Sequence, residues 1–128
     1  MSYRVRPEDV ATKSGAKSSD GTGLNTVGLG DQVLIAPTGQ TAGFTGTKQL
    51  KLIQQVYESG GTHKPHSHPV AEQAYYIVRG RAHVRVGEET FEVEAGTTVY
   101  IPPGVEHEMA NIGDEPLVNL LIDVALND

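Results

Sequence analysis

Residues 74–104 read AYYIVRGRAHVRVGEETFEVEAGTTVYIPPG, and this stretch decides the fold class. Four short runs follow one another here, and each of them ends at a glycine. The segment 81–86 (RAHVRV) places small or apolar residues at every second position and charged or polar residues between them. Side chains on a β-strand point alternately to opposite faces, so this period of two predicts a half-buried strand. The stretch therefore predicts consecutive strands joined by tight turns.

The same pattern extends in both directions from this stretch. Further strands are expected at 32–37, 48–58, 105–113 and 116–126, with a polar connection at 38–47. The last of these could also be helical by periodicity, but its Val and Ile content and the preceding GDEP turn favour a strand. Fifteen glycines and seven prolines supply turns between the runs. About eight short strands predict one all-β domain over 32–128, a sandwich, barrel or jelly roll.

Residues 1–31 are expected to form an N-terminal arm. A proline followed by two acids at 7–9 suits a short helical turn. Residues 12–31 are rich in Gly, Ser and Thr, a composition typical of a flexible segment. Such a segment becomes ordered only by packing on something. We therefore expect the arm to lie across a partner subunit or across its own barrel.

Composition and charge exclude several classes of function. The formal net charge of −6 argues against nucleic acid and against an anionic membrane surface as partners. The sequence has no apolar run near the roughly 18 residues that a membrane span needs, and no leader pattern. These features predict a cytoplasmic protein that acts on a small molecule. Because there is no cysteine, any metal must be bound by nitrogen and oxygen ligands.

A second informative stretch is 63–73, HKPHSHPVAEQ, which holds three histidines within six positions. His66 and His68 are two apart, so on a strand they would share a face and could bind one metal at about 2.0–2.1 Å. Taken alone, the pair suits a polar surface equally well. His107 follows a Pro-Pro-Gly turn at 102–104, and such a turn fixes the direction in which the imidazole projects. Together His66, His68 and His107 predict a metal site.

Both histidine segments resemble the two signature motifs of the cupin superfamily. The first motif is matched at Gly60, His66, His68 and Gly80, and the second at Gly96, Pro102, Gly104, His107 and Asn111. The resemblance covers residues 33–124, and fifteen residues (81–95) separate the two motifs. It implies a double-stranded β-helix (jelly-roll) barrel with a metal inside, ligated from both motifs.

Two neighbouring residues compete for the fourth ligand position. Counting three residues from His68 gives Glu72, whereas counting back from Gly80 to the position the motif prescribes gives Gln73. Neighbours on a strand point to opposite faces, so only one of them can face inward. The turn at Gly80 pins the preceding strand, and this register favours Gln73. Tyr75 would share that inner face and is a candidate substrate-binding residue. Some cupins similar to this arrangement, including sugar-acid enzymes, carry Gln in place of Glu.

The resemblance implies one divalent transition metal ion (Mn, Fe, Co, Ni, Cu or Zn) held by His66, His68, Gln73 and His107. Neutral ligands leave the full charge of the ion in place, which makes it a stronger Lewis acid towards a carbonyl or enolate oxygen. We expect an isomerase- or lyase-type enzyme acting on a small oxygenated, enolisable substrate. The alternatives are a dioxygenase using O₂ at the same metal and a non-catalytic cupin that binds a small molecule.

The other polar residues receive plainer interpretations. His63 lies outside the motif and is interpreted as a surface residue, with a supporting role behind the metal ligands as the alternative. Asn111 is interpreted as a residue that bonds to turn backbone. His83 alternates with Arg81 and Arg85 opposite the apolar face and is expected to meet solvent or a subunit. This exposed row, an arm packed across a partner and the sheet edges of a small barrel together predict a homodimer.

Overall fold

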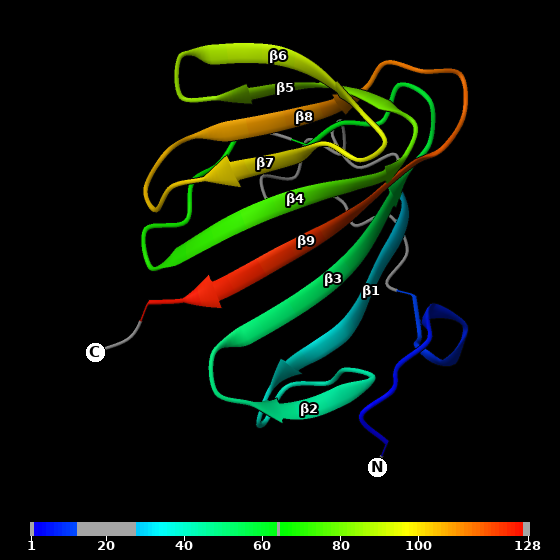
Figure 1. Ribbon diagram of the computed structural model, residues 1–128, viewed down its shortest axis with the longest axis vertical. Helices are drawn as coiled ribbons and strands as arrows, with labels where there is room; N and C mark the ends of the chain where they lie inside the picture. The colour runs from blue at the N-terminus through cyan, green and yellow to red at the C-terminus, as the bar shows by residue number, and fades with distance from the viewer. Residues whose placement is uncertain (1, 13–27, 64, 127–128) are drawn as a thin grey trace.

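The structure is a computed structural model, and it describes residues 2–12, 28–63 and 65–126. Over these residues it contains one short 3-10 helix and nine strands (Figure 1). Their bounds are η1 Pro7–Asp9, β1 Gly28–Pro37, β2 Phe44–Thr47, β3 Leu50–Tyr57, β4 Ala71–Arg79, β5 Arg81–Val86, β6 Glu89–Glu94, β7 Thr98–Ile101, β8 His107–Asn111 and β9 Leu117–Ala125.

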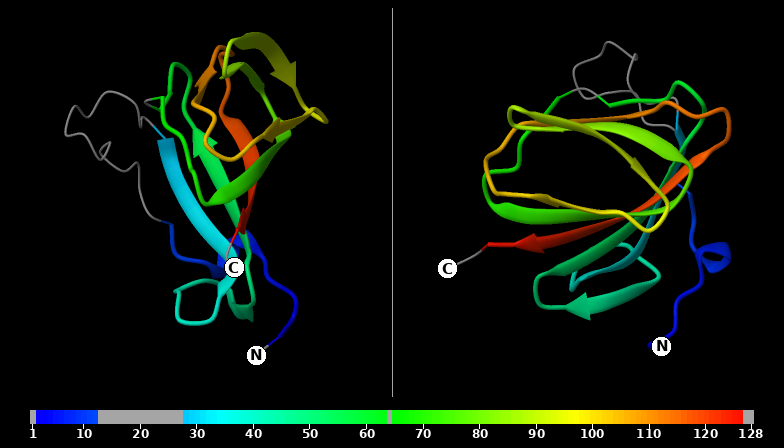
Figure 2. Two further views of the ribbon diagram at one scale, coloured as in Figure 1. Left: turned by 90° about the vertical axis from the view of Figure 1, so that its left-hand side faces the viewer. Right: turned by 45° about the horizontal axis from the view of Figure 1, so that its top comes forward.

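The strands form two sheets. The larger has the order β2-β1-β3-β9-β4-β7, and the smaller has the order β6-β5-β8. Neighbouring strands are antiparallel, except that β1 and β2 are parallel. The smaller sheet lies against one end of the larger sheet, and the two enclose an interior (Figure 2). This is the all-β double-stranded β-helix that the sequence predicts.

The interior is filled by one hydrophobic core. Its buried members come from both sheets and are Tyr57, Tyr75, Ile77, Ala82, Val84, Val93, Val99, Ile101, Met109, Leu117 and Leu121. On β5 the predicted alternation is confirmed, because Ala82 and Val84 are fully buried while Arg81 and His83 are exposed. Burying such apolar side chains supplies most of the favourable free energy of folding.

Gly80 marks the corner where the chain leaves the larger sheet and enters β5. Its φ is +93°, a conformation that favours glycine. A Cβ atom added here would lie 3.0 Å from both Pro116 O and Leu117 Cα, so a side chain would also be crowded. The corner fixes the end of β4; on this strand the register with β9 shifts between Ile77 and Arg79, and Gln73 pairs with Asp123.

Several expected boundaries differ from the structure. β1 begins at Gly28, four residues before the expected start at 32, because the backbone of Gly28 and Gly30 pairs with Tyr57 and Val56 of β3. Within the expected connection 38–47, β2 pairs in parallel with the end of β1. The C-terminal segment is a strand, as expected, and η1 confirms the helical turn.

Residues 2–12 are the first described part of the expected N-terminal arm. Residues 2–12 lie against the chain's own β1 and β2 region: the Gln32 side chain donates hydrogen bonds to Pro7 O and Val10 O, and the rings of Tyr3 and Phe44 are 5.8 Å apart. Residues 13–27 lie outside the described part of the chain. The expectation that this segment packs on a partner subunit or on the barrel therefore stays a prediction. No described helix is long and apolar enough to cross a membrane.

Candidate metal centre

Three histidines from two segments converge at one end of the barrel. His66 and His68 lie in the loop between β3 and β4, and His107 is the first residue of β8. The loop is tied to β8 by an isolated β-bridge, in which His66 N–H donates to His107 O and His107 N–H donates to His66 O, at 3.1 and 2.9 Å. Ligand nitrogens of the three rings lie within 4.8 Å of one another. The structure therefore brings together the three predicted histidines.

The hydrogen bonding of the two ring nitrogens of His107 indicates what the cluster of three histidines could bind. Its Nδ1 lies 3.0 Å from Val105 O and is the donor of that bond, so Nε2 is the bare nitrogen of a neutral ring. Nε2 is buried and has no hydrogen-bond partner among the described residues. An unpaired buried acceptor is costly, and a metal ion would satisfy it. The residues present therefore fit a divalent ion bound by imidazole.

Burial keeps two of these imidazoles, those of His107 and His68, neutral. Burial lowers the pKa of His107 to about 4, helped by the positive charges of His66, His68 and Arg85, while the Val105 carbonyl acts in the opposite direction. Burial, and then His66, also lowers the pKa of His68, against an opposing effect of Asp123. Only a deprotonated imidazole can bind a metal, so the rings of His107 and His68 can accept a cation without first releasing protons at neutral pH.

Gln73, not Glu72, faces the interior. Gln73 is buried, and its Nε2 donates a hydrogen bond of 2.6 Å to Oδ2 of Asp123. Glu72 is only partly buried and accepts a hydrogen bond of 2.9 Å from the hydroxyl of Tyr100. A carboxylate can only accept, so it fixes which end of the Gln73 amide points towards Asp123. The register predicted from Gly80 is the one the structure shows, and ligation by Gln73 remains a proposal.

His63 is buried, so the interpretation of His63 as a surface residue was wrong. Its side chain is 9% exposed, its ring centroid is 4.6 Å from that of His66, and its Nε2 lies 3.4 Å from the hydroxyl of Tyr75. Tyr75 is buried as expected, with its ring 6.4 Å from that of His107. Burial, together with the negative charge of Asp31, raises the pKa of Tyr75, so its hydroxyl keeps its proton.

Arg85 on β5 clamps the two residues that flank His107. Its Nε donates to Glu108 Oε1 at 2.8 Å, and its NH2 group donates to Glu106 Oε1 at 2.9 Å. NH1 donates to the carbonyl of Gly87 in the same turn region. One guanidinium therefore bonds to the side chains of both residues next to His107.

The sequence also did not point to Asp123. This residue lies in an apolar strand, and its role depends on the pairing of β9 with β4, which only the topology shows. Asn111 does what was expected: its Nδ2 donates to Tyr57 O and Glu115 O, and its Oδ1 accepts from Gly113 N–H. It ties the turn after β8 to the end of β3.

The fold and the site define a class: small double-stranded β-helix proteins with imidazoles gathered inside the barrel. Residues 53–123 match the family model of the cupin domain, and the chain belongs to the cupin family.

Curated relatives agree with this assignment. The chain is 39% identical over 74 residues to an uncharacterized protein of Methanocaldococcus jannaschii, covering 58% of each. It is 33% identical over 86 residues to the polyketide synthase CurC of Streptomyces cyaneus, covering 66% of this chain and 51% of the relative. It is 33% identical over 110 residues to oxalate decarboxylase of Bacillus subtilis, covering 77% and 28%. The chain thus spans less than two thirds of the length of each relative.

Solved structures support the fold. The cupin domain of Cnp3 from Schizosaccharomyces pombe superposes with a TM-score of 0.61 at 17% identity, over 64% of this chain and 60% of that chain. Recombinant oxalate oxidase in complex with glycolate gives a TM-score of 0.57 at 24% identity, over 62% and 43%.

Proposed function

We propose that this protein is a metal-dependent cupin enzyme acting on a small oxygenated, enolisable substrate, in reactions of the isomerase or lyase type. The observation that carries the proposal is the buried, unpartnered Nε2 of His107 beside His66 and His68. The relatives named oxalate decarboxylase and polyketide synthase CurC support chemistry on small oxygenated carbon compounds. A bound divalent ion would supply Lewis-acid polarisation of a substrate carbonyl or carboxylate oxygen.

The chain's own residues would bind and orient this substrate. His66, His68 and His107 would hold the ion, with Gln73 as the fourth ligand. Because all four ligands are neutral, a substrate anion would meet the full positive charge of the ion. The protonated hydroxyl of Tyr75 would donate a hydrogen bond to a substrate oxygen, and the core above it would exclude water.

Asp123 is the candidate for proton transfer. It is half-buried, its carboxylate is close enough to influence the pKa of His68, and it accepts a hydrogen bond from Gln73. A carboxylate in this place can take a proton from a carbon next to a carbonyl and return it to a neighbouring carbon. Gln73 would keep that carboxylate in a fixed position.

The test starts with metal analysis of protein purified without added metal, where about one divalent ion per chain is expected. Metal-loaded protein is then incubated without oxygen in D₂O with a panel of 2-oxo acids and hydroxyketones, and proton NMR follows deuterium incorporation next to the carbonyl. Exchange that Asp123→Asn abolishes supports the proposal. The Asn side chain keeps an acceptor for Gln73, so this variant separates the loss of a base from the loss of a positioned amide.

Two outcomes would replace the proposal. Oxygen uptake with an enolisable substrate, without anaerobic exchange, identifies a dioxygenase. A protein that purifies without metal and only binds a small molecule identifies a non-catalytic cupin.

A further inference from the structure

Lys51 lies on the inward face of β3. The pairing of β3 with β9 is continuous over Leu50–Tyr57, so the side chains alternate between the two faces without interruption. Lys51 therefore shares its face with Ile53, which packs against the core, and with Tyr57, which is buried. This direction is unusual, because the charged side chains of a half-buried antiparallel strand normally point to solvent.

The register places Lys51 in one row with residues at the edge of the candidate metal centre. On β9 the partner of Lys51 is Asp123, and on β4 the partner of Asp123 is Gln73. Residues directly opposite each other in an antiparallel pair have Cβ atoms about 4.5–5.5 Å apart. A cation, an anion and an amide therefore follow one another across three neighbouring strands of the larger sheet.

The ammonium group of Lys51 has no partner among the described residues. The side chain is partly buried, and neither an ion pair nor a hydrogen bond joins it to another described group. Its neighbour Asp123 instead accepts the hydrogen bond of 2.6 Å from Gln73. A charge that is partly removed from water and left unpaired is costly, and an anionic group bound beside it would remove that cost.

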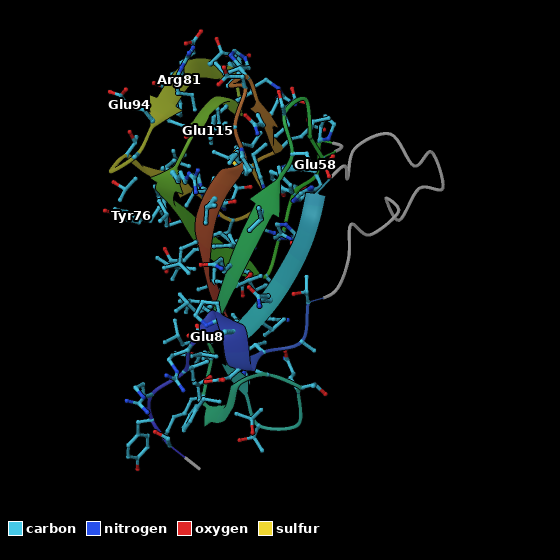
Figure 3. The ribbon with its side chains drawn as sticks, turned by 90° about the vertical axis from the view of Figure 1, so that its right-hand side faces the viewer. Glu8, Glu58, Tyr76, Arg81, Glu94 and Glu115 are labelled. Atoms are coloured by element: carbon cyan, nitrogen blue, oxygen red, sulfur yellow. The ribbon has the colours of Figure 1, made fainter. Side chains whose placement is uncertain are left out.

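The other cationic residues of the strands lie elsewhere. Arg79 is exposed and pairs with Glu115 at 3.7 Å, and Arg81 and Arg85 occupy outward positions of β5. Figure 3 shows Arg81 and Glu115 beyond the arrowhead of β3, at the end of this strand opposite to Lys51. Within the described strands, Lys51 is thus the only lysine or arginine on the inward face of either sheet.

The spacing of the strands sets the size of the ligand that could join Lys51 to the metal centre. Neighbouring strands are about 4.8 Å apart, so the backbones of Lys51 and Gln73 lie about 10 Å from each other, and the four-carbon stem of the lysine covers about half of that gap. A substrate with a short carbon chain spans the rest.

We propose that Lys51 binds a second anionic group of the substrate, a carboxylate or a phosphate, while the other end of the substrate meets the metal ion. This inference rests on the proposed function, because it takes the three histidines as ligands of that ion. Lys51 would offset the negative charge of Asp123 and the net charge of −6, both of which repel a dianion. The substrate class is then a 2-oxo or 2-hydroxy acid that carries a second anion.

The test compares ligands that differ only in the second anion. The compounds 2-oxoglutarate and 2-oxopentanoate share the 2-oxo acid end, and 2-oxopentanoate has a methyl group in place of the distal carboxylate. The corresponding pair for phosphate is 3-phosphoglycerate and glycerate. Each compound is titrated calorimetrically, without oxygen, into metal-loaded protein, and the dissociation constants are compared within each pair.

Three variants isolate the charge of Lys51. Lys51→Met removes the charge and keeps an unbranched stem, Lys51→Arg keeps the charge, and Lys48→Met removes an exposed charge from the turn before β3. The wild-type protein should bind one dianion at least tenfold more tightly than the matching monoanion. Lys51→Met should abolish this preference while its metal content and its affinity for the monoanion stay within twofold of wild type. Lys51→Arg and Lys48→Met should both retain the preference, and the pair that shows it identifies the second anion as carboxylate or phosphate.

Three results would overturn the proposal. The first is a wild-type protein that retains its metal but does not distinguish the members of either pair, which leaves the proposed metal-dependent function in place. The second is an equal loss of affinity for both members of a pair in Lys51→Met, which would show that the ammonium acts on their shared end or holds Asp123. The third is a protein that retains no metal and binds none of the four compounds, which would overturn the proposed function as well.

Discussion

Gln73 on β4 and Asp123 on β9 face each other across neighbouring strands and share a hydrogen bond of 2.6 Å. The carboxylate accepts, so the Gln73 nitrogen is turned towards it and the amide oxygen is left for another partner. This pair sets the charge at the edge of the site: one neutral amide and one anion.

Because of this pair, the conservative change Gln73→Glu should lower the free energy of unfolding. Gln73→Glu would place two carboxylates at hydrogen-bond distance, and in metal-free protein this should lower the free energy of unfolding by about 2 kcal/mol. Gln73→Glu combined with Asp123→Asn should restore most of the loss, because one acceptor is again paired with a donor. Urea denaturation of the EDTA-treated variants measures both effects. A Gln73→Glu protein as stable as wild type would show that the amide does not meet Asp123.

Metal affinity should depend on Gln73 and not on its neighbour. Gln73→Ala removes the proposed fourth ligand and should weaken binding of a divalent ion at least tenfold in calorimetric titration. Glu72→Ala is the matched control, since Glu72 accepts its hydrogen bond from Tyr100 outside the interior, and affinity should stay within twofold. The reverse result would assign the ligand to Glu72.

The stability of metal-free protein should fall in acid because of His107. Its pKa is lowered to about 4 from the ordinary 6.5, chiefly by burial, so the folded state binds the proton more weakly than the unfolded state. The contribution is complete above pH 6.5 and is lost as the pH falls through 6.5 towards 4, by about 3 kcal/mol. His68, whose pKa is also lowered, acts in the same direction. Urea denaturation between pH 7.5 and 4 measures the slope, and His107→Gln should flatten it.

Arg85 should matter to the site although it touches no ligand side chain. Arg85→Leu leaves Glu106 and Glu108 unpaired on both sides of His107, and should weaken metal binding several-fold and lower the free energy of unfolding only slightly. Arg81→Leu is the control on the same strand, because its ion pair with Glu92 is exposed and 3.7 Å long. Equal effects of the two changes would argue against a clamp.

His63 should prove dispensable for binding the ion. His63→Gln should retain about one ion per chain, whereas His66→Gln should lose it. The exchange removes the contact with the Tyr75 hydroxyl and should lower the unfolding free energy by about 1 kcal/mol. Metal analysis after gel filtration decides the point, and loss of metal from His63→Gln would make it a ligand.

The strands were predictable where side chains alternate, and were missed where they do not. The period of two in 81–86 reports directly which face is buried. At the start of β1, Gly28 and Gly30 carry no side chain to show such a period, and the strand exists because their backbone pairs with β3. β2 has only four residues, too few to show a period, and it exists because its backbone pairs in parallel with the end of β1.

The cluster of His66, His68 and His107 was predictable because its members lie in two short segments whose Gly and Pro turns are visible in the sequence. His63 and Asp123 were not, since their environments depend on contacts between distant segments. His63 becomes buried when the loop after β3 folds over Tyr75, and Asp123 meets Gln73 only once β9 inserts between β3 and β4.

Because of the crowded corner at Gly80, the number of residues in β4 decides whether Gln73 or Glu72 faces the site. Because Gly80 cannot accept a side chain beside Pro116 and Leu117, the strand is counted from that fixed end. Deleting one residue between Gln73 and Ile77, ahead of the register shift that follows Ile77, would move Glu72 into the inward position and exchange a neutral amide for an anion. A single codon lost in this strand would thus convert the charge of the site while leaving every histidine in place.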